Sequence, residues 1–74
     1  MADTVAAMAS SDVAELSTLR AQLEELAARV VAVGDRYREG ADSAVTNDLD
    51  LAERSLIGAR RALERAAGTL AELS

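Results

Sequence analysis

The 74-residue sequence contains no cysteine, proline, histidine, lysine, tryptophan or phenylalanine, and Tyr37 is its single aromatic residue. Without cysteine there is no disulfide, and a sheet would lack the aromatic and β-branched residues that it needs. A proline-free chain rich in Ala, Leu, Glu and Arg favours helix instead. The missing His, Cys and Lys are the commonest general bases, nucleophiles and metal ligands. We therefore expect a protein that is not an enzyme and that binds no cofactor.

The charge balance is acidic, with a net charge of −5 at pH 7. Binding to nucleic acid begins with neutralising phosphates, so we expect no nucleic-acid partner. No apolar run approaches the roughly 20 residues of a membrane span, and no basic segment opens a secretory signal at the N-terminus. We therefore expect a cytoplasmic protein without a membrane partner. All eight basic residues are arginine, a usage typical of GC-rich genomes such as those of actinobacteria.

The clearest pattern is a set of apolar rows in which residues recur seven positions apart. Steps of 3 and 4 alternate along Leu16, Leu19, Leu23, Leu26, Val30, Val33 and Tyr37. They alternate again along Val45, Leu49, Ala52, Leu56, Ala59, Leu63, Ala66, Leu70 and Leu73. This is the heptad pattern of two helices that pack along a seam, which is the pair of rows facing the other helix.

The chain reverses where this pattern is interrupted, and we predict an all-α fold: a two-helix antiparallel hairpin forming a single domain over 4–74. Helix 1 is predicted over 12–39, the turn over 40–43 and helix 2 over 44–73. Segment 1–11 is left as an N-terminal segment that could extend helix 1. Gly40 is predicted to end helix 1 in the left-handed conformation. Folding back at the turn pairs Val33 with Leu49 and Leu26 with Leu56.

A hairpin this small buries a thin core, and such chains often need oligomerisation to reach useful stability. Four small or apolar residues outside the seam fall on one side of the predicted hairpin: Ala27, Val31, Gly34 and Ile57. Scattered exposed aliphatic residues would need no explanation. The alternative, which we prefer, is an interface that joins two hairpins into a four-helix bundle or binds a protein partner.

Two charged clusters offer alternatives. The outer side of helix 2 carries a candidate strip for an anionic ligand or an acidic partner, formed by Arg54, Arg60, Arg61 and Arg65. The predicted turn and the start of helix 2 carry weak candidates for a calcium-like site: Asp42, Asp48, Asp50 and Glu53. They fit a calcium loop incompletely, because Ala44 and Asn47 occupy its third and sixth places. Solvated charges at the start of a helix explain these acids better.

One further resemblance involves the stretch Leu16-x-x-Leu19-Arg20-x-x-Leu23-Glu24. It is similar to the opening helix of the all-helical chorismate mutases, in which that arginine holds a substrate carboxylate. The family also has a lysine on this helix, which the present chain lacks. The sequence thus favours a non-enzymatic helical interaction module that dimerises. A ligand or cation sensor is the alternative, and a chorismate-mutase-like enzyme is the remote one.

Overall fold

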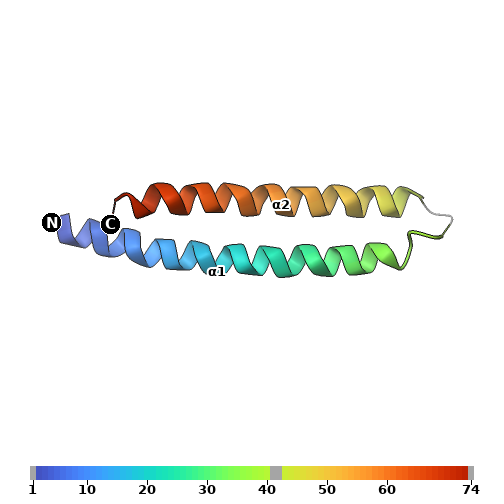
Figure 1. The fold of residues 1–74 in the computed structure, drawn as a ribbon, viewed down its shortest axis with the longest axis horizontal. Coiled ribbons are helices and arrows are strands. Elements are labelled where there is room, and N and C mark those ends of the chain that lie inside the picture. The colour runs from blue at the N-terminus through green and yellow to red at the C-terminus, as the bar shows by residue number, and fades with distance from the viewer. Residues whose placement is uncertain (1, 41–42, 74) are drawn as a thin grey trace.

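The computed structural model describes residues 2–40 and 43–73, with side chains over 4–40 and 44–73. Helix α1 (Ala2–Asp35) and helix α2 (Ser43–Ala71) run antiparallel and side by side, so the two ends of the chain lie at the same end of the hairpin (Figure 1). The described residues contain no strand. The Cα atoms span 60 × 14 × 11 Å, which is the shape of a rod. The predicted all-helical pair of packed helices is confirmed.

Helix α1 includes the N-terminal segment that the sequence left open. It begins at Ala2, and nothing between there and Asp12 interrupts it, because that stretch lacks proline and glycine. Ala9 is 5% exposed and Ala6 is half-buried, so this extension packs in the hairpin and does not project from it. Helix α1 therefore covers most of the length of α2.

The other end of α1 differs from the prediction. The helix ends at Asp35, four residues before the predicted 39, and the chain continues in turns. The Arg36 amide donates to Val33 O (3.1 Å) and the Tyr37 amide to Gly34 O (3.0 Å), so the end is tightened by bonds that reach back three residues. The prediction of a left-handed Gly40 is wrong, because no described residue has a positive φ. Gly40 instead closes a turn by donating to Tyr37 O (3.0 Å).

The helices pack through one of the two predicted rows on each helix. The shared rows are half-buried, and they comprise Leu16, Leu23, Val30, Leu49, Leu56, Leu63 and Leu70. The predicted second row of α1 is wrong, because its members are exposed: Leu19 37%, Leu26 44% and Val33 37%. Tyr37, which the spacing placed in the shared row after Val30, lies beyond the end of α1 and is 48% exposed. On α2, Ala59, Ala66 and Leu73 are exposed in the same way.

The second row that does face the partner helix lies one residue further along each helix. On α1 it contains Arg20, Ala27 and the buried Gly34, and on α2 it contains Glu53, Arg60 and Ala67. Gly34, and not Val33, lies beside Leu49: a Cβ built on Gly34 would be 3.8 Å from Leu49 Cδ1. The small members of this row, Ala27, Gly34 and Ala67, let the helices approach closely where they stand.

Candidate interaction faces

The hairpin has two long faces of different chemistry. An antiparallel helix pair has an approximate two-fold axis across it, so residues that flank the seam on the same angular side of each helix share a face. One face, the charged face, carries Arg20, Glu24, Arg60 and Glu64 beside the seam. The other, the apolar face, carries the exposed rows that the prediction placed inside, namely Leu19, Leu26, Val33, Ala59 and Ala66.

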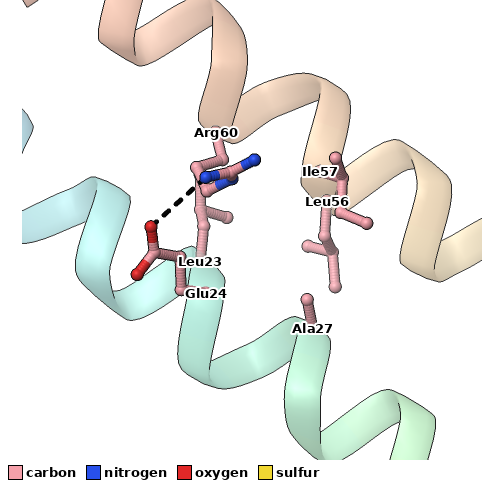
Figure 2. Close-up of a pocket in the computed structure, with 6 residues that line it drawn as sticks. All are labelled: Leu23, Glu24, Ala27, Leu56, Ile57 and Arg60. Carbon is pink, nitrogen blue, oxygen red and sulfur yellow. Dashed lines mark hydrogen bonds and ion pairs between the residues drawn. The ribbon is translucent and has the colours of Figure 1, made fainter.

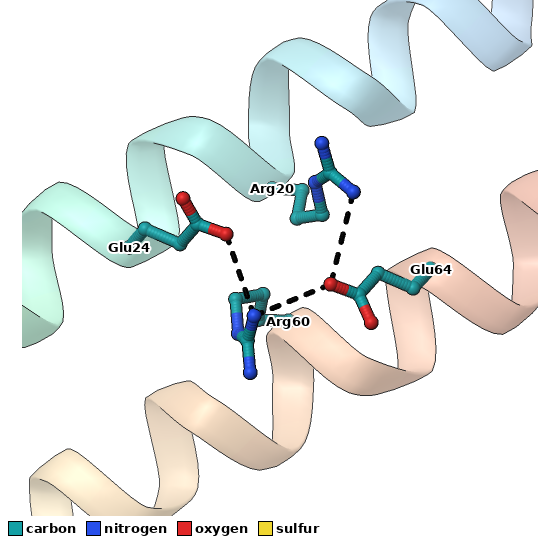
Figure 3. A network of polar contacts seen from close by, with 4 residues as sticks. All are labelled: Arg20, Glu24, Arg60 and Glu64. Atoms are coloured by element: carbon teal, nitrogen blue, oxygen red, sulfur yellow. Dashed lines mark hydrogen bonds and ion pairs between the residues drawn. The ribbon is translucent and has the colours of Figure 1, made fainter.

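An ion-pair network joins the two helices on the charged face. Arg60 Nη1 lies 3.4 Å from Glu24 Oε1 and 3.3 Å from Glu64 Oε1, and Glu64 in turn lies 3.7 Å from Arg20 Nη1 (Figure 3). All four side chains retain solvent exposure, so each pair contributes little stability. Two arginines and two glutamates also balance in charge, which leaves the network without a net attraction for an anion.

Beside this network lies a groove of about 260 Å³ between the helices. Its walls are Leu23 and Ala27 from α1 and Leu56 and Ile57 from α2, while Glu24 and Arg60 lie at one end (Figure 2). Two of the four residues predicted as an interface, Ala27 and Ile57, are therefore groove walls. The other two are placed differently: Val31 is half-buried and Gly34 is buried against Leu49. These four residues contribute to packing within the hairpin.

The predicted arginine strip divides in the structure. Arg60 belongs to the ion-pair network, whereas Arg54, Arg61 and Arg65 are exposed. The Arg54 Nε donates to the Asp50 carbonyl one turn earlier (3.4 Å). The arginines on this side of α2 are therefore tied to neighbouring acidic residues and backbone or point into solvent, and they do not converge on one point.

The acidic candidates do not form a loop. Asp48, Asp50 and Glu53 lie within the opening turns of α2, and Asp42 lies outside the described residues. A calcium loop wraps its ligands around the ion, whereas a continuous helix points successive side chains outward. Within 2–40 and 43–73 no group of three or more His, Cys, Asp or Glu side chains could hold a metal ion.

The apolar face is the feature that sequence reasoning missed, because it assigned these residues to the core. Its α1 side carries Leu19, Leu26 and Val33, with Val5 (58% exposed) and Met8 (61% exposed) towards the N-terminus. Its α2 side is lined by small residues, which are Ala52, Ser55, Ala59, Ala62 and Ala66. The sequence contained evidence for this face. Ala27 and Gly34, seven residues apart, form a third row of small residues on α1, so α1 has more apolar rows than one seam can bury.

Arg20, the residue shared with the chorismate-mutase helix, is half-buried beside the seam. Its Nη1 faces Glu64 across the hairpin (3.7 Å), and its Nε is enclosed without a hydrogen-bond acceptor among the described atoms. The carboxylate nearest to this arginine is therefore one supplied by α2.

Comparison with known proteins adds no further information: no protein family, no curated protein and no solved structure matches the chain. Neither α1 nor α2, over the residues described, combines the length and apolar character that crossing a membrane requires.

Proposed function

We propose that this protein is a non-enzymatic helical interaction module, a small scaffold or regulatory adaptor that works through protein contacts and pairs with a second copy into a four-helix bundle. The observation that carries the proposal is the exposed row of Leu19, Leu26 and Val33 on α1. Exposed apolar residues that recur along one helix mark an interaction surface, whereas isolated ones do not.

The surface area of the hairpin supports pairing. The chain exposes 5387 Å². A globular monomer of 7.7 kDa would expose about 4,300 Å² by the usual scaling of surface with mass. The excess of about 1,000 Å² is comparable to the roughly 800 Å² that each partner contributes to a stable protein interface. One further hairpin laid along this rod would therefore bring the surface per chain close to that of a globular protein.

The core is correspondingly thin. Among the described hydrophobic side chains, Ala9 alone is buried, with 5% of its surface exposed, and the leucines of the seam are half-buried. Ordering a residue costs about 1–2 kcal/mol of backbone entropy, which must be offset mainly by apolar burial. Half-buried leucines contribute less than fully buried ones, so covering the apolar face is an effective way to add stability.

Sedimentation equilibrium at micromolar concentration tests the proposal. We expect the wild type to be a dimer and Leu26→Glu to shift it to a less stable monomer. Ala32→Glu is the matched control, because it adds the same charge to an exposed position of α1 outside the apolar face. Val31→Glu changes a residue of the interface that was predicted from the sequence, and we expect this variant to remain dimeric. A monomeric, fully helical wild type would refute self-association.

The alternative of a ligand or cation sensor gains no specific support from the exposed arginines or the acidic end of α2. A thermal-shift series with calcium, nucleotides and cyclic dinucleotides separates the two functions. We expect a flat response across the series. A reproducible, saturable rise in melting temperature with any of these ligands would favour the sensor.

A further inference from the structure

We infer that the partner on the apolar face is a second copy that runs in the opposite direction along α1. The two-fold axis then passes between Leu19 and Gln22 on α1 and beside Ala62 on α2. This inference rests on the self-association proposed above and adds the surface, the direction and the register. In it α1 packs on α1 of the second copy, and α2 packs on α2 of the second copy.

The first argument is the order of charges along α1. The row that borders the exposed leucines carries Glu15 in its N-terminal half, Gln22 at its middle and Arg29 in its C-terminal half, and Asp12 lies in the row of the leucines themselves, seven residues before Leu19. Among the described residues, Asp12, Glu15 and Arg29 take part in no ion pair within the hairpin. An antiparallel second copy would bring its Arg29 beside these acids, twice by symmetry. A parallel copy would set like charge against like.

The second argument is the apolar register that this pairing creates. With the axis between Leu19 and Gln22, the apolar side chains of each copy fit between the apolar side chains of the other copy, as knobs pack into holes in a coiled coil. Leu19 then lies between Leu19 and Leu26 of the second copy. Val33 falls beside Val5 and Met8 of the second copy, which are the two most N-terminal exposed large apolar residues of α1. The whole exposed row is thereby covered by its own symmetry mate.

The third argument comes from α2 and is independent of the charges. Two contacts show which residues of α1 and α2 lie side by side along the hairpin. Arg20 contacts Glu64 (3.7 Å), and Gly34 lies at Leu49. By that correspondence the axis between Leu19 and Gln22 meets α2 beside Ala62. The small residues Ala59 and Ala66 stand on either side of that point. Two α2 helices can therefore approach closely at the height where α1 requires the axis.

A different two-fold axis, parallel to the helices, would pack α1 of one copy on α2 of the other. The side of α2 that lines the apolar face carries alanine and serine over 52–66 and no basic residue. Asp12, Glu15 and Arg29 would then find no opposite charge there. The antiparallel arrangement with its axis between Leu19 and Gln22 is the one that pairs these three residues.

Single cysteines in this cysteine-free chain test the register. We expect Gln22→Cys to give a covalent dimer under mild oxidation or with a short bis-maleimide, because both copies of Gln22 lie near the axis. Arg29→Cys is the matched control from the same row, used at a concentration at which sedimentation equilibrium shows this variant to be dimeric. We expect it to cross-link little, since its two copies lie far apart in an antiparallel pair. Equal cross-linking at both positions would indicate parallel pairing and overturn the inference.

Charge reversal tests the ion pairs directly. We expect Glu15→Arg and Arg29→Glu each to weaken dimerisation on the order of tenfold, and the double variant to recover most of that loss. Glu15 and Arg29 are too far apart on α1 to compensate within one chain, so recovery requires contact between copies. This arrangement would be overturned if the wild type is dimeric but the double variant shows no recovery and Gln22→Cys does not cross-link. A monomeric wild type would instead refute the proposed function.

Discussion

Replacing Gly34 by alanine tests which row of α1 faces α2. Gly34 lies one residue before the end of α1 and is buried against Leu49. The added Cβ would lie 3.8 Å from Leu49 Cδ1 and 3.9 Å from Leu49 Cβ, which is ordinary van der Waals contact. Its φ is not positive, so alanine requires no change of backbone conformation. Alanine should therefore stabilise the hairpin by about 0.5–1 kcal/mol through reduced unfolded-state entropy and the added contact.

The measurement is urea unfolding followed by circular dichroism, with Gly58→Ala as the control. A Cβ on Gly58 meets nothing within 4 Å, so its gain reports helix propensity without packing. For a domain of this size 1 kcal/mol corresponds to a rise in melting temperature of about 4–8 °C. Suppose that Gly34→Ala destabilises the protein or dissociates the dimer, while Gly58→Ala stabilises the protein. That result would show that Gly34 packs against another hairpin. The one-residue rotation of the seam would then be wrong.

Two further predictions concern the contacts between the helices. Leu56→Ala removes a half-buried seam residue, and we expect a loss near the lower end of the 2–5 kcal/mol known for buried leucines, visible as a lower melting temperature by circular dichroism. An unchanged melting temperature would show that Leu56 is not in the seam. Arg60→Ala breaks the contacts to Glu24 and Glu64, and we expect a loss below about 1 kcal/mol because these pairs are solvent-exposed. A larger loss that persists at high salt would mean that the arginine stem, and not its charge, holds the helices together.

The sequence alone determined the class of fold. The lack of proline, the abundance of good helix formers and the heptad spacing of Leu16, Leu23 and Val30 predict helix, and the interruption near Gly40 predicts one reversal. The second helix follows equally from Leu49 and the leucines seven residues apart after it. These features are local, because each depends on propensity and spacing within a few turns.

The end of the first helix was harder to predict from the sequence. The sequence predicted a helix that continued to 39, whereas α1 ends at Asp35 and Arg38 pairs with that aspartate (3.4 Å) in the turns that follow. Gly40 suggested a left-handed cap, whereas bonds that reach back three residues close the end. Both types of end satisfy the last carbonyl groups, so residue type did not distinguish between them.

Tertiary structure alone decided which two rows form the seam. Each helix carries a shared apolar row with a further row on either side of it, and a heptad pattern does not rank those two neighbours. The bulkier row, with Leu19 and Leu26, was the natural choice from the sequence. On α1 the structure uses the smaller one, with Ala27 and Gly34, because small side chains allow close approach and bring Arg20 and Arg60 within reach of glutamates on the opposite helix. That rotation by one residue left the leucines outside and gave the protein its apolar face.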